Sequence, residues 1–291
     1  MNEQENLRVV YQGIPGSYSE ASLLEFANTY GITISPLEEQ DFFEGLFESI
    51  VHSTGIGWVP VSNSHAGTVH QAIDMFLKYD VEIIAEYYFR VDHMLAVIPG
   101  TKIQDIATAY SHTQALSQCS EFLRNHHIPT LAYHDTAGAA KMVSEMGDKT
   151  RAAVCSKRAA EMYGLEIVAE QIQNENNNTT RFLLVKRKDE HFNFENIIED
   201  SNDEKYKTTV IFAAKEEAGS LYQCISGFAG AGINMSKLES RRSKDGSYDY
   251  LFYLDYNRKL DDPASLGALV VLREHSDLVR VLGSYPVHSS S

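Results

Sequence analysis

One pattern recurs five times in the first 165 residues: a short apolar strand, then small or polar residues, then a helix. The segments that fit the strand part are residues 9–11, 56–61, 107–110, 130–133 and 152–155. Because strands that alternate with helices are typical of open α/β sheets, the pattern predicts a doubly wound, largely parallel sheet.

Residues 81–97 break this pattern, because they lack helix caps and are rich in β-branched and aromatic residues. We interpret them as strands that cross between two lobes of one domain, with a cleft between the lobes. The predicted fold class is α/β, with a two-lobed, doubly wound domain that is periplasmic-binding-protein type II-like.

Composition narrows the class of partner. The formal net charge of −15 argues against nucleic acid or an anionic membrane surface, because neutralising phosphates needs clustered Lys and Arg. Cys119, Cys155 and Cys224 are far apart, which argues against disulfides and a zinc site, so we expect reduced cysteines and no metal. The chain start lacks the regions of a signal peptide, and no apolar run approaches a membrane span, so we expect a cytoplasmic protein.

The length of 291 residues suggests about two domains, and an acidic segment suggests where they separate. Seven acids and no Lys or Arg lie between Asp189 and Glu204, as expected of a solvated linker. We therefore predict a first domain at 1–188, a linker at 189–206 and a second domain at 207–291. The second domain has the order βαββαβ, which is the ferredoxin-like arrangement and suits sensing or subunit pairing.

Polar residues follow several predicted strands. In open α/β sheets the ligand crevice lies beyond the carboxyl ends of the strands, where helix N-termini present free N–H groups to an anion. An acidic protein can therefore hold a small carboxylate without a basic patch, through residues at that edge: Ser17, Asn63, Ser64, Ser111 and Thr136.

A second polar cluster, NTTRF at residues 178–182, precedes the apolar run 183–185 and so lies where a loop becomes a strand. It places a hydroxyl, a guanidinium and an aromatic ring in consecutive positions. A reacting molecule in a cleft can contact such a cluster.

The ordered motifs give the chain a family resemblance. It resembles prephenate dehydratase with a C-terminal ACT domain, through GIPGSYSEA at 13–21, PVSNS at 60–64, SHTQALSQC at 111–119, DTA at 135–137, NTTRF at 178–182, GIN at 232–234, ESR at 239–241 and LGSYP at 282–286. The chain departs from the family at Ser62, where Glu is usual, and at Ala218, Ser220 and Arg242 in the second domain.

The resemblance implies conversion of prephenate to phenylpyruvate with loss of water and CO2, without metal or cofactor. It nominates Thr180 to assist the leaving hydroxide, in a relay with Ser64 or a water molecule, by electrostatic preorganisation. We expect Arg181 to hold the side-chain carboxylate, so that Arg181→Ala raises KM while Thr180→Ala lowers kcat. The alternative for Arg181 is a structural ion pair, and Phe182 either walls the ring or belongs to the core. The predicted substrate-binding residues are Ser17, Asn63, Ser111, Thr136 and Thr179.

The second domain is expected to bind L-phenylalanine as an allosteric effector. In related ACT units an amino acid sits between a helix-start loop and a strand-end motif, across a subunit interface, so a homodimer or homotetramer is expected. The matching positions are Gly219, Ser220, Leu221, Asn234, Glu239 and Ser240. Gly227-x-x-Gly230-x-Gly232 follows a helix rather than a strand, so we interpret it as packing and turn glycines instead of a nucleotide site.

Two alternatives stay open at this point. Arogenate, which carries an amino group in place of the side-chain keto oxygen, is a rival substrate. A chain that lacks the usual Glu at Ser62 can also be a small-carboxylate binding protein without turnover. With no chorismate mutase unit ahead of Arg8, a monofunctional enzyme is expected.

Overall fold

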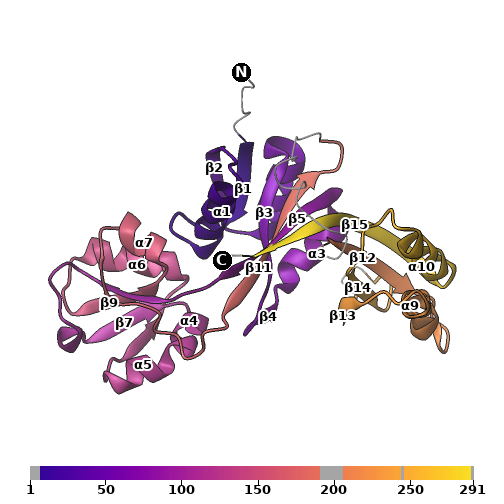
Figure 1. The fold of residues 1–291 in the computed structure, drawn as a ribbon. Coiled ribbons are helices and arrows are strands. Elements are labelled where there is room, and N and C mark those ends of the chain that lie inside the picture. The colour runs from indigo at the N-terminus through magenta and orange to yellow at the C-terminus, as the bar shows by residue number, and fades with distance from the viewer. Residues whose placement is uncertain (1–6, 191–205, 244–245, 290–291) are drawn as a thin grey trace. The chain divides into compact units, whose positions relative to one another are not determined.

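The computed structural model describes residues 7–190, 206–243 and 246–289, which form two compact units (Figure 1). The first unit holds residues 7–79 and 87–182, and the second holds 80–86 and the described part of 183–288. Most of the predicted linker, residues 191–205, lies outside the described residues. The domain boundary placed there stays a prediction.

The first lobe of unit one is built on a parallel sheet. Strand β1 (Leu7–Gln12) lies parallel to both β2 (Ile34–Gln40) and β3 (Ile56–Asn63), and β11 (Thr179–Arg187) lies next to β3. The short β4 (Gly67–Thr68) pairs with the end of β3. The helices of this lobe are α1 (Tyr18–Thr29), α2 (Phe43–Ser49), which continues into a π-helical turn (Ile50–Thr54), and α3 (His70–Lys78).

Aromatic side chains fill the core of this lobe. The Trp58 ring stacks on Phe182 with centroids 5.5 Å apart and lies 4.9 Å from Phe26. Its indole N–H donates to the Ser22 hydroxyl at 2.8 Å, so the buried ring has its polar atom satisfied. This packing holds the start of β11 in place beside β3.

The second lobe has a five-stranded sheet with apolar clusters on both faces. Its strands are β6 (Met94–Val97), β7 (Thr108–Ser111), β8 (Thr130–Ala132), β9 (Arg151–Cys155) and β10 (Glu166–Ala169), in the order β10-β6-β9-β7-β8. Leu95 and Val97 pack in one cluster while Ala96 packs in the other, because successive side chains of a strand alternate between faces. The covering elements are a 3-10 turn (Ile103–Asp105), α4 (Thr113–Gln118), α5 (Ser120–Asn125), α6 (Thr136–Met146) and α7 (Lys157–Met162).

The two lobes confirm the predicted two-lobed, doubly wound fold. Strand β5 (Val81–Arg90) and β6 together form the predicted extended stretch, with a break at residues 91–93. The parallel pairing of β7 with β8 and β9 agrees with the prediction, whereas β6 and β10 run antiparallel to their neighbours. The chain returns to the first lobe through residues 170–178 and β11.

The second unit has the predicted βαββαβ order. Its elements are β12 (Tyr206–Ala214), α9 (Ser220–Gly230), β13 (Met235–Arg241), β14 (Leu251–Tyr256), α10 (Pro263–Glu274) and β15 (Ser276–Ser289). The strand order is β13-β14-β12-β15, so β13 is the edge strand of the described sheet. Gly227 lets α9 approach α10, because an added Cβ would lie 3.0 Å from the Ala268 Cα, and Gly232 forms a turn at φ +66°. Both glycines therefore have the structural roles expected of them.

Strand β15 pairs with β5 as well as with β12. At this contact Gly283 faces the backbone of Ile83, where an added Cβ would lie 2.1 Å from the carbonyl oxygen. The first half of β5 therefore belongs to the second unit.

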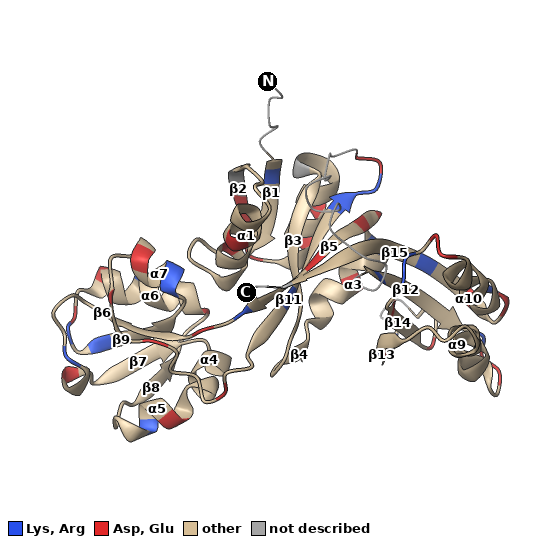
Figure 2. Ribbon diagram, in the orientation of Figure 1, with Lys and Arg blue, Asp and Glu red and all other residues tan. Residues whose placement is uncertain are grey.

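Figure 2 shows acidic and basic residues interspersed over the elements of both units. The described part of the chain contains no helix long and apolar enough to cross a bilayer. The three cysteines are buried and free, as predicted, and burial raises the pKa of Cys119 and of Cys155 to about 12.

Candidate functional site

A cavity of about 500 Å³ lies in the first unit and is lined by residues of both lobes. The start of α1, the end of β3, the start of β11 and the N-terminal ends of α4 and α6 all contribute residues to its lining. Its lining includes five predicted site residues: Ser17, Asn63, Thr136, Thr180 and Phe182. The structure thus brings together side chains that are 163 positions apart in the sequence (17 to 180).

Thr180 is held at the cavity wall by Asn63. The Asn63 side-chain amide donates to the Thr180 Oγ1 at 3.0 Å and to the Asn178 Oδ1 at 2.8 Å. On the other side, the Asn63 Oδ1 accepts the backbone N–H groups of His65 and Ala66, each at 3.0 Å. Asn63 therefore joins the turn after β3 to the start of β11.

Further hydrogen bonds extend from Asn178 across the cavity wall. The Asn178 Nδ2 donates to the Gln118 Oε1 at 3.2 Å, and the same oxygen lies 2.8 Å from the His93 Nε2. The His93 Nδ1 lies 2.6 Å from the Tyr18 hydroxyl, which also lies 3.1 Å from the Asp92 carbonyl oxygen. Burial lowers the pKa of His93 below its ordinary value.

Helix N-termini reach the cavity as expected. The Ser17 hydroxyl caps α1 by accepting the Glu20 N–H at 3.3 Å. Asp135 caps α6 by accepting the Gly138 N–H at 2.6 Å, which places Thr136 in the first turn of that helix. The free N–H groups of these two helices can face an anion in the cavity.

Three predicted hydroxyl residues, Ser64, Ser111 and Thr179, are not part of the cavity lining. The Ser64 hydroxyl donates to the Asn177 carbonyl oxygen and accepts the Thr179 N–H, so Ser64 and Thr179 join two chain segments. Asn63, and not Ser64, makes the contact with Thr180. The Ser111 hydroxyl is buried and donates to the Val154 carbonyl oxygen, while His112, and not Ser111, caps α4.

Arg181 does not line the cavity either. It lies between Thr180 and Phe182 in β11, and successive strand residues point to opposite faces. Its side chain is buried on the face away from the cavity. The geometry does not support the expected contact between Arg181 and a substrate carboxylate.

Phe182 and Ser62 have plain structural positions. Phe182 is buried and forms part of the cavity wall while its ring stacks on Trp58, so both of its expected roles are combined. Ser62 pairs with Thr68 in the short β3–β4 ladder and does not line the cavity.

The lining of the cavity is uncharged apart from carboxylates and imidazoles. Asp41 and Asp135 line it, together with His93, His112 and His134, and the described lining has no Lys or Arg. A ligand carboxylate must therefore be bound by helix N–H groups and neutral side chains. Within the described residues no group of three or more His, Cys, Asp and Glu is arranged to hold a metal ion.

Several polar lining residues had no predicted role, among them Tyr18, His93, Gln118 and Asn178. Tyr18, Gln118 and Asn178 lie inside the motifs but were assigned no role. His93 had a weaker signal, a polar Asp92-His93 pair between two apolar strands. Such a pair marks a polar break that the core cannot hold without partners.

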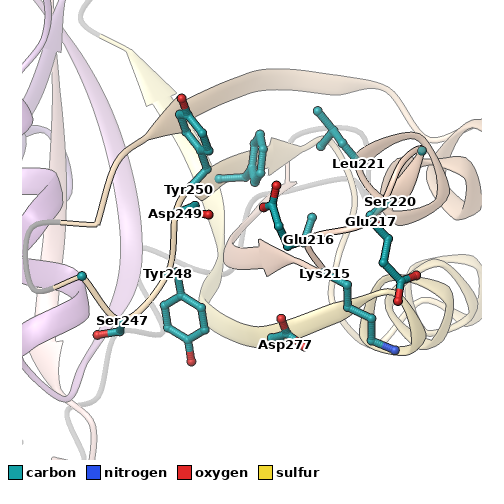
Figure 3. Close-up of a pocket in the computed structure, with 14 residues that line it drawn as sticks. Lys215, Glu216, Glu217, Ser220, Leu221, Ser247, Tyr248, Asp249, Tyr250 and Asp277 are labelled. Carbon is teal, nitrogen blue, oxygen red and sulfur yellow. The ribbon is translucent and has the colours of Figure 1, made fainter.

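A second cavity of about 470 Å³ lies in the second unit (Figure 3). Lys215, Glu216 and Glu217 lie beside the start of α9, and Tyr248 and Tyr250 lie on the other side. The predicted effector residues Gly219, Ser220 and Leu221 line this pocket, whereas Asn234, Glu239 and Ser240 do not. The last three lie on or next to the edge strand β13.

Fold and cavity define a class: a two-lobed α/β protein with a small-molecule cavity, joined to a ferredoxin-like unit that has a pocket of its own. The prephenate dehydratase family model matches residues 9–190. The chain belongs to this family, and so to the lyases of aromatic amino-acid biosynthesis.

Relatives and solved structures agree with this assignment. Arogenate dehydratase/prephenate dehydratase 1, chloroplastic, from Arabidopsis thaliana is 37% identical over 98% of this chain and 73% of its own length. A prephenate dehydratase from Arthrobacter aurescens in complex with L-Phe is 25% identical with a TM-score of 0.84, over 96% of this chain and 90% of that one. A structure described as GqqA, a novel type of quorum quenching acylases, is 28% identical with a TM-score of 0.84, over 96% and 98% of the two chains.

These relatives correct one prediction. The Arabidopsis thaliana dehydratases 1, 2 and 4 are chloroplastic proteins, which contradicts the cytoplasmic location inferred from the chain start. The composition of the first residues was not a sufficient basis for that inference.

Proposed function

We propose that the chain converts prephenate to phenylpyruvate, with loss of water and CO2, in phenylalanine biosynthesis. The observation that carries this proposal is the Thr180 hydroxyl at the cavity wall, held 3.0 Å from the Asn63 amide nitrogen. The cavity volume lies within the range of about 300 to 1,000 Å³ that is usual for small-molecule sites.

The reaction requires help for one leaving group. The ring C–O bond breaks, the ring carboxylate leaves as CO2, and the electron pair of its C–C bond completes the aromatic ring. The departing hydroxide takes one proton, which solvent supplies. Thr180 donates a hydrogen bond to that oxygen as negative charge develops on it, which stabilises the transition state more than the ground state.

The other lining residues are assigned to binding. The substrate carries two carboxylates, and the N-terminal ends of α1 and α6, with Ser17 and Thr136, offer donors to them. Phe182 supports the ring side of the cavity. Arg181 is assigned to the structure of β11 and not to binding, because its side chain is on the other face.

Arogenate is a second candidate substrate, favoured by a specific feature. Asp41 and Asp135 line the cavity, and a carboxylate attracts the ammonium group that arogenate carries in place of the keto oxygen. The Asp135 side chain already caps α6, so Asp41 is the residue to test.

Turnover separates these possibilities. Purified protein is incubated with prephenate or arogenate, and phenylpyruvate or phenylalanine is measured. Prephenate turnover supports the first proposal, and arogenate turnover that Asp41→Asn lowers selectively supports the second. Saturable binding of both compounds without product would overturn both and leave a carboxylate-binding protein.

The second unit is proposed to be an ACT domain that binds L-phenylalanine as an allosteric effector. Gly219 at φ +89° begins α9, so free N–H groups there can bind the amino-acid carboxylate, and Glu216 and Glu217 can attract the ammonium group. Tyr250 and Phe252 offer an apolar wall for the ring. Glu239 and Ser240 lie on the edge strand and do not line this pocket, and in the proposed assembly, a homodimer or homotetramer, a second copy of the chain supplies them.

Thermal unfolding tests the effector site. Millimolar phenylalanine is expected to raise Tm by mass action, and Glu217→Gln is expected to weaken binding by about two- to fivefold, because an exposed charge pair contributes only about 0.2 to 1 kcal/mol. An unchanged Tm at saturating phenylalanine would contradict the assignment.

A further inference from the structure

The donors and acceptors of the hydrogen bonds around the first cavity can be assigned one after another, starting from two backbone N–H groups. The N–H groups of His65 and Ala66 can only donate, and both point at the same atom of Asn63. That atom must be the amide oxygen, so the Asn63 nitrogen faces Thr180 and Asn178. Two backbone groups therefore fix which end of this amide faces Thr180, while the position of the amide also depends on Asn178, which the nitrogen contacts at 2.8 Å.

The orientation of Asn63 also fixes the role of the Thr180 hydroxyl oxygen in their hydrogen bond. An amide nitrogen donates and does not accept, so the Thr180 oxygen accepts from Asn63 at 3.0 Å. The hydroxyl proton of Thr180 is left for another acceptor, and within the described residues the hydroxyl makes no second hydrogen bond. Because Thr180 lines the cavity, its proton is available to a ligand there.

The donors and acceptors of Asn178, Gln118 and His93 follow in the same way. Asn178 accepts from Asn63 through its oxygen, so its nitrogen donates to the Gln118 oxygen. That oxygen accepts, so the His93 Nε2 at 2.8 Å must carry a proton. The Gln118 nitrogen is buried and makes no hydrogen bond within the described residues. The orientation of this amide is therefore set by the two donors that its oxygen accepts, and not by a partner for its nitrogen.

Tyr18 completes the chain. With a proton on Nε2, a neutral His93 has a free lone pair on Nδ1, which accepts the Tyr18 O–H at 2.6 Å. A charged His93 would instead donate from Nδ1 and turn the Tyr18 proton to the Asp92 carbonyl oxygen at 3.1 Å. Burial opposes the charged form, while Gln118 and Asp92 favour it.

We propose that His93 and Tyr18 are positioning residues of the dehydration: they anchor the far end of this hydrogen-bond chain and keep the Thr180 hydroxyl directed into the cavity. They act through Gln118, Asn178 and Asn63 and transfer no proton. The inference rests on the proposed function, because it assigns the chain a part in that reaction.

Substitutions that keep or remove the N–H of His93 test the proposal. A glutamine places its amide nitrogen near the position of Nε2, so His93→Gln retains the donor to Gln118, whereas His93→Met does not. We expect kcat to fall about tenfold in His93→Met and in Tyr18→Phe with KM within about twofold, and to recover in His93→Gln, because small misplacements of a catalytic group lower the rate. The matched control is Tyr87→Phe, which removes a hydroxyl bonded to Glu25 at 2.6 Å outside the cavity and is expected to leave kcat unchanged.

A spectroscopic measurement makes the test independent of turnover. The ¹⁵N chemical shifts of the His93 ring are expected to show a protonated Nε2 and an unprotonated Nδ1 in the wild type, and a mixture of tautomers in Tyr18→Phe. A wild-type ring protonated only at Nδ1, or an unchanged kcat in both Tyr18→Phe and His93→Met, would overturn the proposal. If kcat were unchanged in Tyr18→Phe and His93→Met but low in Thr180→Val, the positioning role would fail and the proposed function would stand. If the wild type turned over neither substrate, the proposed function itself would fail.

Discussion

The two cavities of the chain are built from different kinds of polar group. The cavity of the first unit is lined by amides, hydroxyls and imidazoles that bond to one another, and its Asn178 is 2% exposed. The pocket of the second unit is lined by exposed charged side chains at the start of α9, among them Glu216 and Glu217. Amides and hydroxyls that bond to one another are fixed before a ligand arrives, whereas exposed charged side chains are ordered only when a ligand binds.

The largest effect is expected when Asn63 loses the donor that bonds to Thr180. Asn63→Asp keeps an acceptor for the His65 and Ala66 N–H groups, but it has no donor for Thr180. The Thr180 proton then turns toward the new carboxylate, and we expect kcat to fall about 100-fold or more, as when one preorganised donor is lost.

Steady-state kinetics with prephenate measures this effect. Asn125→Asp, which adds the same charge at an exposed position at the end of α5, serves as the control. A kcat of Asn63→Asp close to that of the wild type would show that the direction of the amide does not matter.

A smaller effect is expected on the stability of the second unit, with little change in catalysis by the first. Gly283→Ala places a Cβ against the Ile83 carbonyl oxygen, and we expect the second unit to lose about 1 to 3 kcal/mol of stability through overpacking. Catalysis at low temperature should change less than stability, because Gly283 does not line the first cavity.

Urea unfolding measures the loss. Gly267→Ala is the matched control. Among the described residues, nothing beyond its own stretch of α10 lies within 4 Å of its added Cβ, and in a helix alanine is expected to stabilise by about 0.5 to 1 kcal/mol. Equal stability changes in the two variants would argue against a tight contact between β15 and β5.

The smallest effect concerns pH. Burial lowers the pKa of His93 below its ordinary value of 6.5. Between the folded and the unfolded pKa, the ring is therefore protonated in the unfolded chain but not in the folded chain. Stability from this group is complete above the unfolded pKa and is lost as pH falls from there toward the folded pKa. Wild type should therefore lose more stability than His93→Gln between about pH 7.5 and about pH 5.5. Equal losses in the two proteins would show that the ring remains accessible to protons.

Much of the fold followed from local pattern. Alternating strands and helices indicated the lobes, because each amphipathic element must bury one face, and the βαββαβ order indicated the second unit. Asn63 and Thr180 both line the cavity, Asn63 at the end of β3 and Thr180 at the start of the neighbouring β11. The position of Asn63 follows from the rule that ligands bind beyond the carboxyl ends of the strands, whereas that of Thr180 depends on the pairing of β11 with β3.

What the sequence did not reveal depends on direction and on distant partners. Arg181 follows Thr180 in a strand, so alternation places it on the opposite face, a consequence that the motif alone conceals. The hydroxyls of Ser64 and Ser111 are taken by backbone groups from other segments, at Asn177 and Val154. Only the folded chain brings these partners together.

Turnover of Thr180→Val isolates the role of the hydroxyl, because valine has nearly the shape of threonine and carries a methyl group in place of the hydroxyl. We expect kcat for prephenate to fall about 100-fold or more while KM changes only a few fold, since the hydroxyl acts on the leaving oxygen in the transition state. A Thr180→Val protein that forms phenylpyruvate at the wild-type rate would show that the hydroxyl takes no part in the reaction.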